Sequence, residues 1–215
     1  MRRTGPPPQP AYVSDANLHV AKRKFYDAAS AAWMVKVLPG EFYITSRSDE
    51  ILVTILGSCI SACIRDPACG LGGMNHFMLP QGGAGSWGDE VQSTRYGNFA
   101  MEKLINELIK AGCSRTRMEV KVFGGGHVIE SQTAIGEQNG EFVLRYLKEE
   151  GLSCLAQDIG GAYARRIQFS PMSGRVIRRL LGAADRDSVM RDESNYANGL
   201  GARPISGAVE LFRAS

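Results

Sequence analysis

The stretch LGSCISACIRDPACGLGGMNHFMLP, residues 56–80, determines how the centre of this chain folds. Two runs that suit β-strands, CISACIR and LGGMNHFML, flank the segment DPACG. An Asp-Pro start and a Gly end are typical of a tight turn. The stretch therefore predicts a β-hairpin, and we expect its loop to span residues 66–69.

This hairpin register brings a thiol and an imidazole together. Arg65 then pairs with Gly70, and Cys59 lies directly opposite His76. Opposed residues of antiparallel strands project from the same face, with Cβ atoms about 4.5–5.5 Å apart. An adjacent imidazole can take the proton of a thiol and stabilise the thiolate nucleophile. We therefore predict that Cys59 and His76 form a catalytic pair.

The residues that precede Cys59 suit the same chemistry. Gly57 lets the backbone turn sharply, so that N–H groups around Ser58 and Cys59 can bind a developing oxyanion. Thr54, on the preceding strand, can hydrogen-bond to the far ring nitrogen of His76 and hold its tautomer. Packing is the simpler alternative, because buried cysteines and strand threonines are more often structural than catalytic.

A zinc site is another interpretation of these side chains. It would use Cys59, Cys63, Cys69 and His76, with the spacing C-x3-C-x5-C-x6-H. That spacing matches no common zinc knuckle, and a hairpin spreads its side chains along its length instead of converging them on one ion. We expect Cys63 and Cys69 to be structural, and we expect no metal or organic cofactor.

The sequence GGGH, residues 124–127, follows a predicted strand. It lacks the Gly-Lys-Ser/Thr ending of a phosphate loop and has no G-x-G-x-x-G continuation, so nucleotide binding is not expected. A glycine-rich wall beside the site is the functional interpretation, and a plain transition from strand to loop is the simpler one.

Strands and helices alternate through the rest of the chain. Hydrophobic patterns predict strands near residues 35–38, 42–45, 50–56, 118–123 and 152–159, and a strand pair over 165–181 with a turn at Pro171–Gly174. Helices are predicted over 95–112 and 139–151, each followed by a glycine stop signal. This pattern favours an α/β (α+β) layered sandwich, with a mixed, largely antiparallel sheet, β-hairpins and flanking helices.

We expect a single core domain over residues 31–184. Residues 1–30 are rich in proline and then basic, which is typical of a flexible extension. Residues 185–215 have no clear period and are expected to form a loosely structured tail, in which AVELF (208–212) is a candidate edge strand.

Charge and hydropathy exclude several classes of partner. The net charge of +3, from 25 Lys+Arg and 22 Asp+Glu, is too small for a nucleic-acid surface. No apolar run approaches the roughly 18–20 residues needed to cross a membrane, and no secretory signal is visible, so a cytoplasmic protein without membrane insertion is expected. Five cysteines without a C-x-x-C pair favour free thiols.

Several motifs together resemble one family. They are LGSC, GGMNHFMLP with its histidine 17 residues after the cysteine, RYGNFAMEKLINELIKAG, KVFGGGHVI, IGEQNGEFVLRYLKEEG and DIGGAYARRIQFSPMSGRV. Over about residues 34–182 the chain is similar to the chemoreceptor glutamine deamidase CheD family. The resemblance implies an enzyme of bacterial chemotaxis that converts glutamine side chains of methyl-accepting chemoreceptor cytoplasmic domains to glutamate.

The resemblance also implies roles and partners. Cys59 matches the nucleophile of the family and His76 matches its histidine. In some members the catalytic threonine precedes the cysteine by six residues, which is Val53 here, whereas Thr54 precedes it by five. The family implies a fold similar to the catalytic domain of cytotoxic necrotizing factor toxins. It also implies association with a CheC-type phosphatase in organisms that have one.

The residues themselves leave other functions open. A Cys–His pair also suits peptide cleavage, acyl transfer to an amine or hydrolysis of receptor methyl esters through a thioester. A non-enzymatic chemotaxis adaptor, which binds receptors or a phosphatase partner, is the alternative from a different class.

Overall fold

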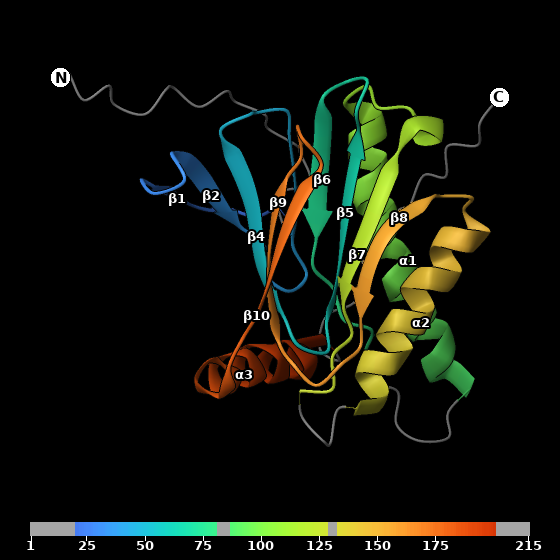
Figure 1. Cartoon of the computed structure of the whole chain (residues 1–215). Helices are drawn as coiled ribbons and strands as arrows, with labels where there is room; N and C mark the ends of the chain where they lie inside the picture. The colour runs from blue at the N-terminus through green and yellow to red at the C-terminus, as the bar shows by residue number, and fades with distance from the viewer. Residues whose placement is uncertain (1–19, 81–86, 129–132, 201–215) are drawn as a thin grey trace.

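Two five-stranded sheets pack face to face in the computed structural model, which describes residues 20–80, 87–128 and 133–200 (Figure 1). The first sheet has the order β1 (Arg23–Asp27), β2 (Ala32–Lys36), β4 (Glu50–Leu56), β9 (Arg165–Ser170), β10 (Arg175–Leu180). The second sheet has the order β3 (Phe42–Thr45), β6 (Leu71–Asn75), β5 (Ile60–Asp66), β7 (Glu119–Gly124), β8 (Cys154–Ile159). The pairs β2–β4 and β7–β8 are parallel and the other neighbours are antiparallel.

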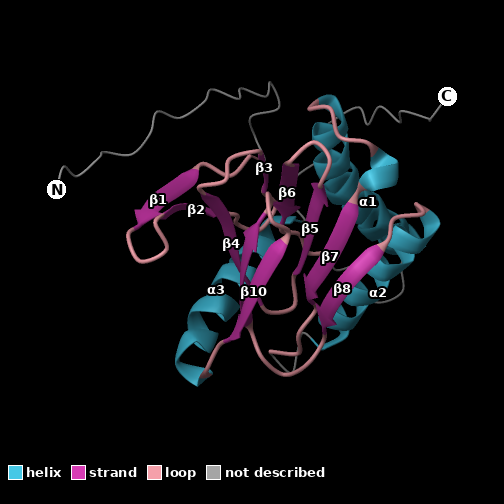
Figure 2. Ribbon diagram, turned by 45° about the horizontal axis from the view of Figure 1, so that its top comes forward, coloured by secondary structure: helices cyan, strands magenta, loops and turns pink. Residues whose placement is uncertain are grey.

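Helices complete a three-layer arrangement. Figure 2 shows α1 (Trp87–Lys110) and α2 (Thr133–Glu149) on the outer side of the second sheet, and α3 (Ala183–Leu200) apart from them at one end of the sandwich. A short 3-10 helix, Arg115–Arg117, leads from α1 into β7. The predicted layered α/β sandwich is confirmed, with its strands divided between two mixed sheets.

Two apolar cores follow from strand alternation. Residues of β5 alternate between them: Ile60, Ala62 and Ile64 face α1 and α2, whereas Cys63 faces the first sheet. Because both faces of β5 are covered, its residues are buried almost throughout. Cys59 continues the inward-facing parity of Cys63 and lies in the core between the two sheets.

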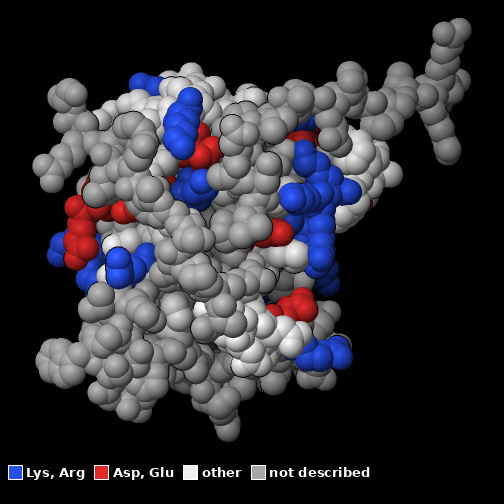
Figure 3. Space-filling view, turned by 180° about the vertical axis from the view of Figure 1, so that it is seen from behind, with Lys and Arg blue, Asp and Glu red and all other residues white. Residues whose placement is uncertain are grey.

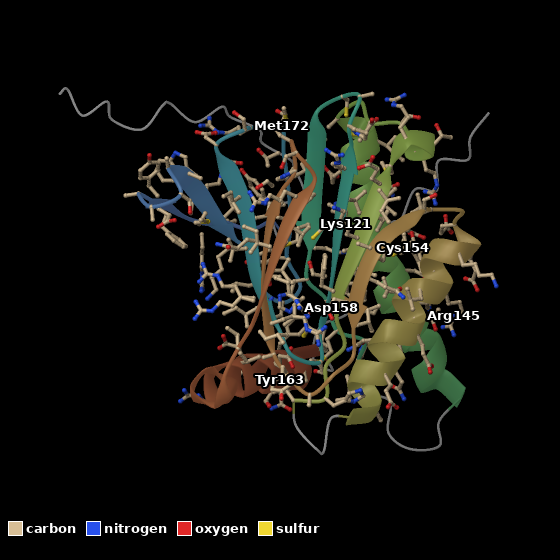
Figure 4. The ribbon with its side chains drawn as sticks, viewed as in Figure 1. Lys121, Arg145, Cys154, Asp158, Tyr163 and Met172 are labelled. Carbon is tan, nitrogen blue, oxygen red and sulfur yellow. The ribbon has the colours of Figure 1, made fainter. Side chains whose placement is uncertain are left out.

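Polar side chains also join the two sheets. Lys121 Nζ of β7 donates a hydrogen bond to the Gly174 carbonyl in the β9–β10 turn, at 2.8 Å. Arg178 of β10 pairs with Asp158 of β8 at 3.1 Å. Figure 4 shows Lys121 and Asp158 in the region between β10 and the strands of the second sheet.

The β5–β6 hairpin is present, but the predicted register is wrong. Arg65 pairs with Gly72 and Asp66 pairs with Leu71, so the loop spans residues 67–70 and not 66–69. Asp66 stays in the strand and closes the turn itself, since its carboxylate accepts a hydrogen bond from Ala68 N at 3.0 Å. Each residue of β5 therefore lies opposite a residue of β6 two positions further along the chain than predicted. An even shift keeps every side chain on its predicted face.

This shift changes how the predicted pair meets. Cys59 lies just before β5, and the adjacent Ile60 forms an isolated bridge with Phe77. Cys59 and His76 are therefore diagonal neighbours on one face, not directly opposed residues.

Asp66 is expected to be a strong determinant of stability. Beyond the turn, its buried carboxylate accepts hydrogen bonds from Ser114 N at 2.8 Å and from Arg117 Nη2 at 2.6 Å. Asp66→Ala removes these hydrogen bonds together with the one from Ala68 N, and should lower the thermal unfolding midpoint by roughly 5 °C. In the control Glu119→Ala, which removes only a partly exposed ion pair with Arg65, the midpoint should barely move; equal losses would contradict the assignment.

The same carboxylate makes this contribution depend on pH. Arg117 first, and then the Ser114 and Ala68 N–H groups, hold the pKa of Asp66 well below its usual range. A folded-state pKa below the unfolded value means that the stabilisation is complete above about pH 4 and is lost as the pH falls further.

Two elements extend beyond the predicted core. The strand β1 begins at Arg23, within the expected extension, and α3 forms within the segment expected to be a loose tail. The sequence of α3 is polar and shows no helical period of apolar residues, so the helix was not predicted. The AVELF segment lies outside the described residues. No helix of the described chain is long and apolar enough to cross a membrane. In the view from behind, basic side chains form a column along the right side and further groups on the left, with acidic side chains close to both (Figure 3).

Candidate active site

The candidate site lies where the chain crosses from the first sheet to the second. The crossing segment, Gly57–Cys59, connects the end of β4 to the start of β5. Cys59 is fully buried, and Ser58 is 2% exposed. The thiol thus lies at the end of the sandwich, between the two sheets.

The carbonyls of Gly57–Cys59 are held from one side. Their donors are Gly126 N (2.7 Å, to Gly57), Asn139 Nδ2 (2.8 Å, to Ser58) and Gly125 N (2.8 Å, to Cys59). Gly124 approaches so closely that a Cβ built there would lie 2.0 Å from the Cys59 carbonyl oxygen, at φ +120°. Only glycine fits at this position. The GGGH segment therefore packs against the crossing segment and fixes its orientation.

With the carbonyls held, the N–H groups of the crossing segment point to the opposite side and converge on Glu193 of α3. Gly57 N and Cys59 N donate to Glu193 Oε1 at 2.8 and 3.1 Å, and Ser58 N and Oγ donate to Oε2 at 2.9 and 2.8 Å. Converging backbone N–H groups form an anion-binding nest. We call these three N–H groups and the Ser58 hydroxyl the amide nest.

Sequence analysis missed Glu193 and Asn139. Glu193 is 134 residues from Cys59 and lies in a polar segment without a helical period, so nothing in the sequence relates it to the nest. The sequence predicts a helix that begins at Asn139 but no role for this side chain in the site. Its Oδ1 accepts a hydrogen bond from Leu79 N at 2.8 Å, which lets the same side chain support both Ser58 and the segment after His76.

The imidazole of His76 is held in one tautomer. Thr54 Oγ1 donates its hydrogen to the Val37 carbonyl at 2.8 Å and lies 2.7 Å from His76 Nδ1. Since the hydroxyl hydrogen is used by Val37, Nδ1 must donate to Thr54 and carry the ring proton. The other nitrogen, Nε2, then bears a lone pair, and it is buried without a hydrogen-bond partner.

Strand parity explains why Thr54 reaches His76. Thr54 shares its face of β4 with Leu52 and Leu56, which pack in the core between the sheets. Val53, six residues before Cys59, lies on the opposite face and is buried. Its side chain has no hydrogen-bonding atom, so it cannot make the contact that Thr54 makes.

A thiol, an imidazole and a carboxylate come together in this site. Cys59 Sγ, a ring nitrogen of His76 and a carboxylate oxygen of Glu193 all lie within 4.8 Å of one another. Burial raises the pKa of the Cys59 thiol well above its usual range, and the Glu193 charge raises it further. Burial also lowers the pKa of His76 to about 4. At neutral pH the pair is therefore a thiol and a neutral imidazole.

The four side chains considered for zinc do not converge. Cys59 and His76 group with Glu193, whereas Cys69 groups with Asp66 and Cys113 near the hairpin loop, where the two sulfurs are 2.9 Å apart. Cys63 belongs to neither group and packs in the core between the sheets. The exposed Cys154 lies on β8, away from α3 (Figure 4).

Comparison with known proteins places this chain in a family. The chain is 47% identical over 190 residues to a Rhodopseudomonas palustris protein named "Probable chemoreceptor glutamine deamidase CheD", covering 88% of this chain and 89% of that one. A family model described as "CheD chemotactic sensory transduction" matches residues 78–180. This chain belongs to the CheD family.

Other CheD relatives extend the comparison. A protein of the same name from Hydrogenovibrio crunogenus is 48% identical, over 88% of this chain and 100% of its own length. Another, from Bordetella avium, is 53% identical, over 74% of this chain and 70% of its own length. The family-model match begins after Thr54, Cys59 and His76, so the roles of these residues rest on their geometry. A solved Bacillus licheniformis protein, YfiH, is 13% identical, covers 54% of this chain and 49% of its own, and has a TM-score of 0.36.

Proposed function

We propose that this CheD-family chain is a cysteine-dependent protein-glutamine deamidase that acts on the cytoplasmic domains of chemoreceptors. The observation that carries the proposal is the meeting of a buried thiol, a tautomer-fixed imidazole and an amide nest at one end of the sandwich. These are the three components that acyl transfer from an amide requires. The names of the relatives supply the substrate class.

In the proposed reaction His76 Nε2 takes the proton of the Cys59 thiol, and the sulfur attacks Cδ of the substrate glutamine. His76 then gives this proton to the departing amide nitrogen as the C–N bond breaks, which releases ammonia and leaves a thioester. Water, deprotonated by His76, attacks the thioester, and the C–S bond breaks to give glutamate and the free thiol. Atoms and charge balance without a metal or an organic cofactor.

The amide nest stabilises the two tetrahedral intermediates of the proposed reaction, one formed by attack of the sulfur and one by attack of water. Each carries a negative oxygen derived from the glutamine side chain, and the N–H groups of Gly57–Cys59 are already aligned toward one point. Donors that are preorganised in this way need no reorientation during the reaction. Because Gly125, Gly126 and Asn139 hold the opposite side of the segment, the alignment does not depend on the substrate.

Thr54 acts as a positioning residue. Thr54→Val keeps the shape of the side chain but removes the contact with His76 Nδ1, so kcat should fall by up to about 100-fold with little change in KM. Thr54→Ser, which keeps the hydroxyl, should restore most of the rate. The measurement is steady-state ammonia release from a receptor fragment; a Thr54→Val enzyme as fast as Thr54→Ser would exclude the role.

Product analysis tests the proposal against its alternatives. We expect incubation of a receptor cytoplasmic fragment with the protein to release ammonia without cross-linked or cleaved fragment. Cleavage would indicate a peptidase, and cross-linking would indicate acyl transfer to an amine. Methanol release from methylated fragments would reveal ester hydrolysis by the same thiolate. Binding that does not depend on Cys59 and yields no product would favour an adaptor.

The proposed reaction changes the charge of the chemoreceptor. Each conversion of glutamine to glutamate adds a negative charge to a helical bundle, where like charges at neighbouring positions repel. The modification therefore biases the packing and signalling state of the receptor. Association with a CheC-type phosphatase remains a prediction from the family resemblance.

A further inference from the structure

Glu193 stands apart from the other buried acidic side chains of the described chain. Those side chains pair with cations: Glu50 with Lys24 at 3.0 Å, Asp66 with Arg117 at 2.6 Å and Glu107 with Lys110 at 3.3 Å. Glu193 is 2% exposed and is bound instead by the amide nest. Its charge is thus placed where the reaction needs to stabilise negative oxygen.

The Glu193 side chain has the same chemical structure as the product of the proposed reaction. Glutamate is the product of the proposed reaction, and it differs from the substrate glutamine only in having an oxygen in place of the amide nitrogen. Glu193 also projects from a helix, as the receptor side chains do in a helical bundle. Its carboxylate lies within 4.8 Å of both the Cys59 sulfur and a ring nitrogen of His76. Glu193 therefore has the surroundings expected of a bound product.

The docked helix closes the site. Cys59 has no exposed surface, and the small pocket beside His76 is bounded by Val189, Asp192 and Glu193 of α3 and does not reach Cys59. A receptor side chain whose oxygen is to bind the amide nest beside the sulfur must therefore take the place of Glu193.

The described side chains of α3 are those of Val189 and of residues 191–200. Among its described side chains, Val189, Glu193 and Leu200 are buried. Tyr196 adds contact with Gly40 and a hydroxyl–hydroxyl hydrogen bond with Tyr96 of α1. The described part of α3 thus buries Val189 and Leu200 and packs Tyr196 and Ala197 against the core between the sheets. A terminal helix held by such contacts can leave the sandwich locally while the two sheets stay folded.

We propose that α3 is an internal product mimic, which keeps the active site closed by occupying the amide nest with Glu193 until a receptor helix displaces it. This inference rests on the proposed function for the identity of the displacing ligand. Substrate and α3 compete for one site, so the docked population reduces apparent affinity for the receptor without changing the chemical step.

The first test measures access to the thiol and needs no deamidase activity. Glu193→Ala should increase the rate of Cys59 alkylation by iodoacetamide at least about 10-fold, because the sulfur becomes accessible and loses a neighbouring negative charge. Peptide mapping assigns the alkylated cysteine, and the matched control is Asn195→Ala at an exposed position of α3. Equal alkylation of wild type and Glu193→Ala, with both still melting cooperatively, would overturn the proposal.

Steady-state kinetics distinguish two roles for Glu193: an internal competitor of the substrate, or a residue that only shapes the crossing segment. For a receptor fragment, Glu193→Ala should lower KM and leave kcat unchanged, since an internal competitor has been removed. If Glu193 only shaped the crossing segment, its loss would instead lower kcat at constant KM, and that result would overturn the proposal.

The second test makes the enzyme its own substrate. In Glu193→Gln the new amide should lie against Cys59, and the protein should convert it to glutamate at a rate independent of protein concentration. Peptide mass spectrometry would detect the amide-to-acid change, with Cys59→Ala/Glu193→Gln as the silent control and the exposed Gln138 as an internal reference.

The tests distinguish failure of the mimic from failure of the proposed function. Receptor deamidation by a Glu193→Gln protein whose own new amide stays unconverted would overturn product mimicry and leave the proposed function intact. If neither substrate reacted, the deamidase proposal would fail, and the alkylation result alone would then show whether α3 closes the site.

Discussion

Cys59→Ala is expected to reduce deamidation of a receptor fragment below about one-thousandth of the wild-type rate while the protein stays folded. In the proposed mechanism the sulfur of Cys59 forms the thioester, and among the described cysteines only Cys59 is grouped with His76. Removing a fully buried thiol costs packing, which we expect to be about 1 kcal/mol. The measurements are ammonia release and the thermal unfolding midpoint.

Cys63→Ala is the matched control for this variant. Cys63 lies four residues further along the same face, and it is 1% exposed in the same core. Burial raises the pKa of its thiol well above the usual range, as it does for Cys59, but Cys63 is not grouped with His76, so no imidazole is placed to take its proton. We expect a similar loss of stability with wild-type kcat. Activity that survives in Cys59→Ala would end the proposed mechanism.

The second large effect is expected for His76→Ala. In the proposed mechanism the imidazole accepts the thiol proton, protonates the departing nitrogen and activates water, so its loss should lower kcat by about 10²- to 10⁴-fold. Thr54 and the Val37 carbonyl cannot replace it, because neither presents a base to Cys59. A loss below about 10-fold would indicate that another group moves these protons.

The pH dependence of the wild-type enzyme gives an independent check on His76. Burial lowers the pKa of His76 to about 4, so the imidazole of the free enzyme keeps its lone pair well below the usual value near 6.5. The acid limb of kcat/KM, which reports the free enzyme, should therefore lie below that value. An acid limb at or above pH 6.5 would contradict a neutral, buried imidazole.

Much of the site followed from strand parity alone. The predicted register was wrong, but an even shift left Cys59 and His76 on one face, so their meeting survived the error. Parity also favours Thr54 over Val53, since Leu52 and Leu56 share its face. The register itself depends on Asp66, which stays in the strand and accepts a hydrogen bond from Ala68 N. The turn sequence DPACG does not predict this side-chain hydrogen bond.

The rest required tertiary structure. The amide nest forms only because Gly125, Gly126 and Asn139, all more than 60 residues further along the chain, bind the carbonyls behind it. Glu193 reaches the nest from a polar helix whose sequence shows no hydrophobic period. Contacts of this range leave no local pattern for sequence analysis to detect.

The docked state of α3 also affects how activity should be measured. If Glu193 holds the nest closed, wild-type turnover at low receptor concentration will underestimate the chemical capacity of the site. Glu193→Ala therefore belongs beside wild type in every assay of the proposed function.

The most direct test of the central claim is peptide mass spectrometry of a receptor cytoplasmic fragment after incubation in ¹⁸O-labelled water. Four proteins should be compared: wild type, Glu193→Ala, Cys59→Ala and His76→Ala. The account predicts conversion of particular glutamines to glutamate, with one labelled oxygen in each new carboxylate, by the first two proteins and not by the last two. A fragment that binds both wild type and Glu193→Ala and is left unchanged by each would contradict the deamidase assignment and favour an adaptor.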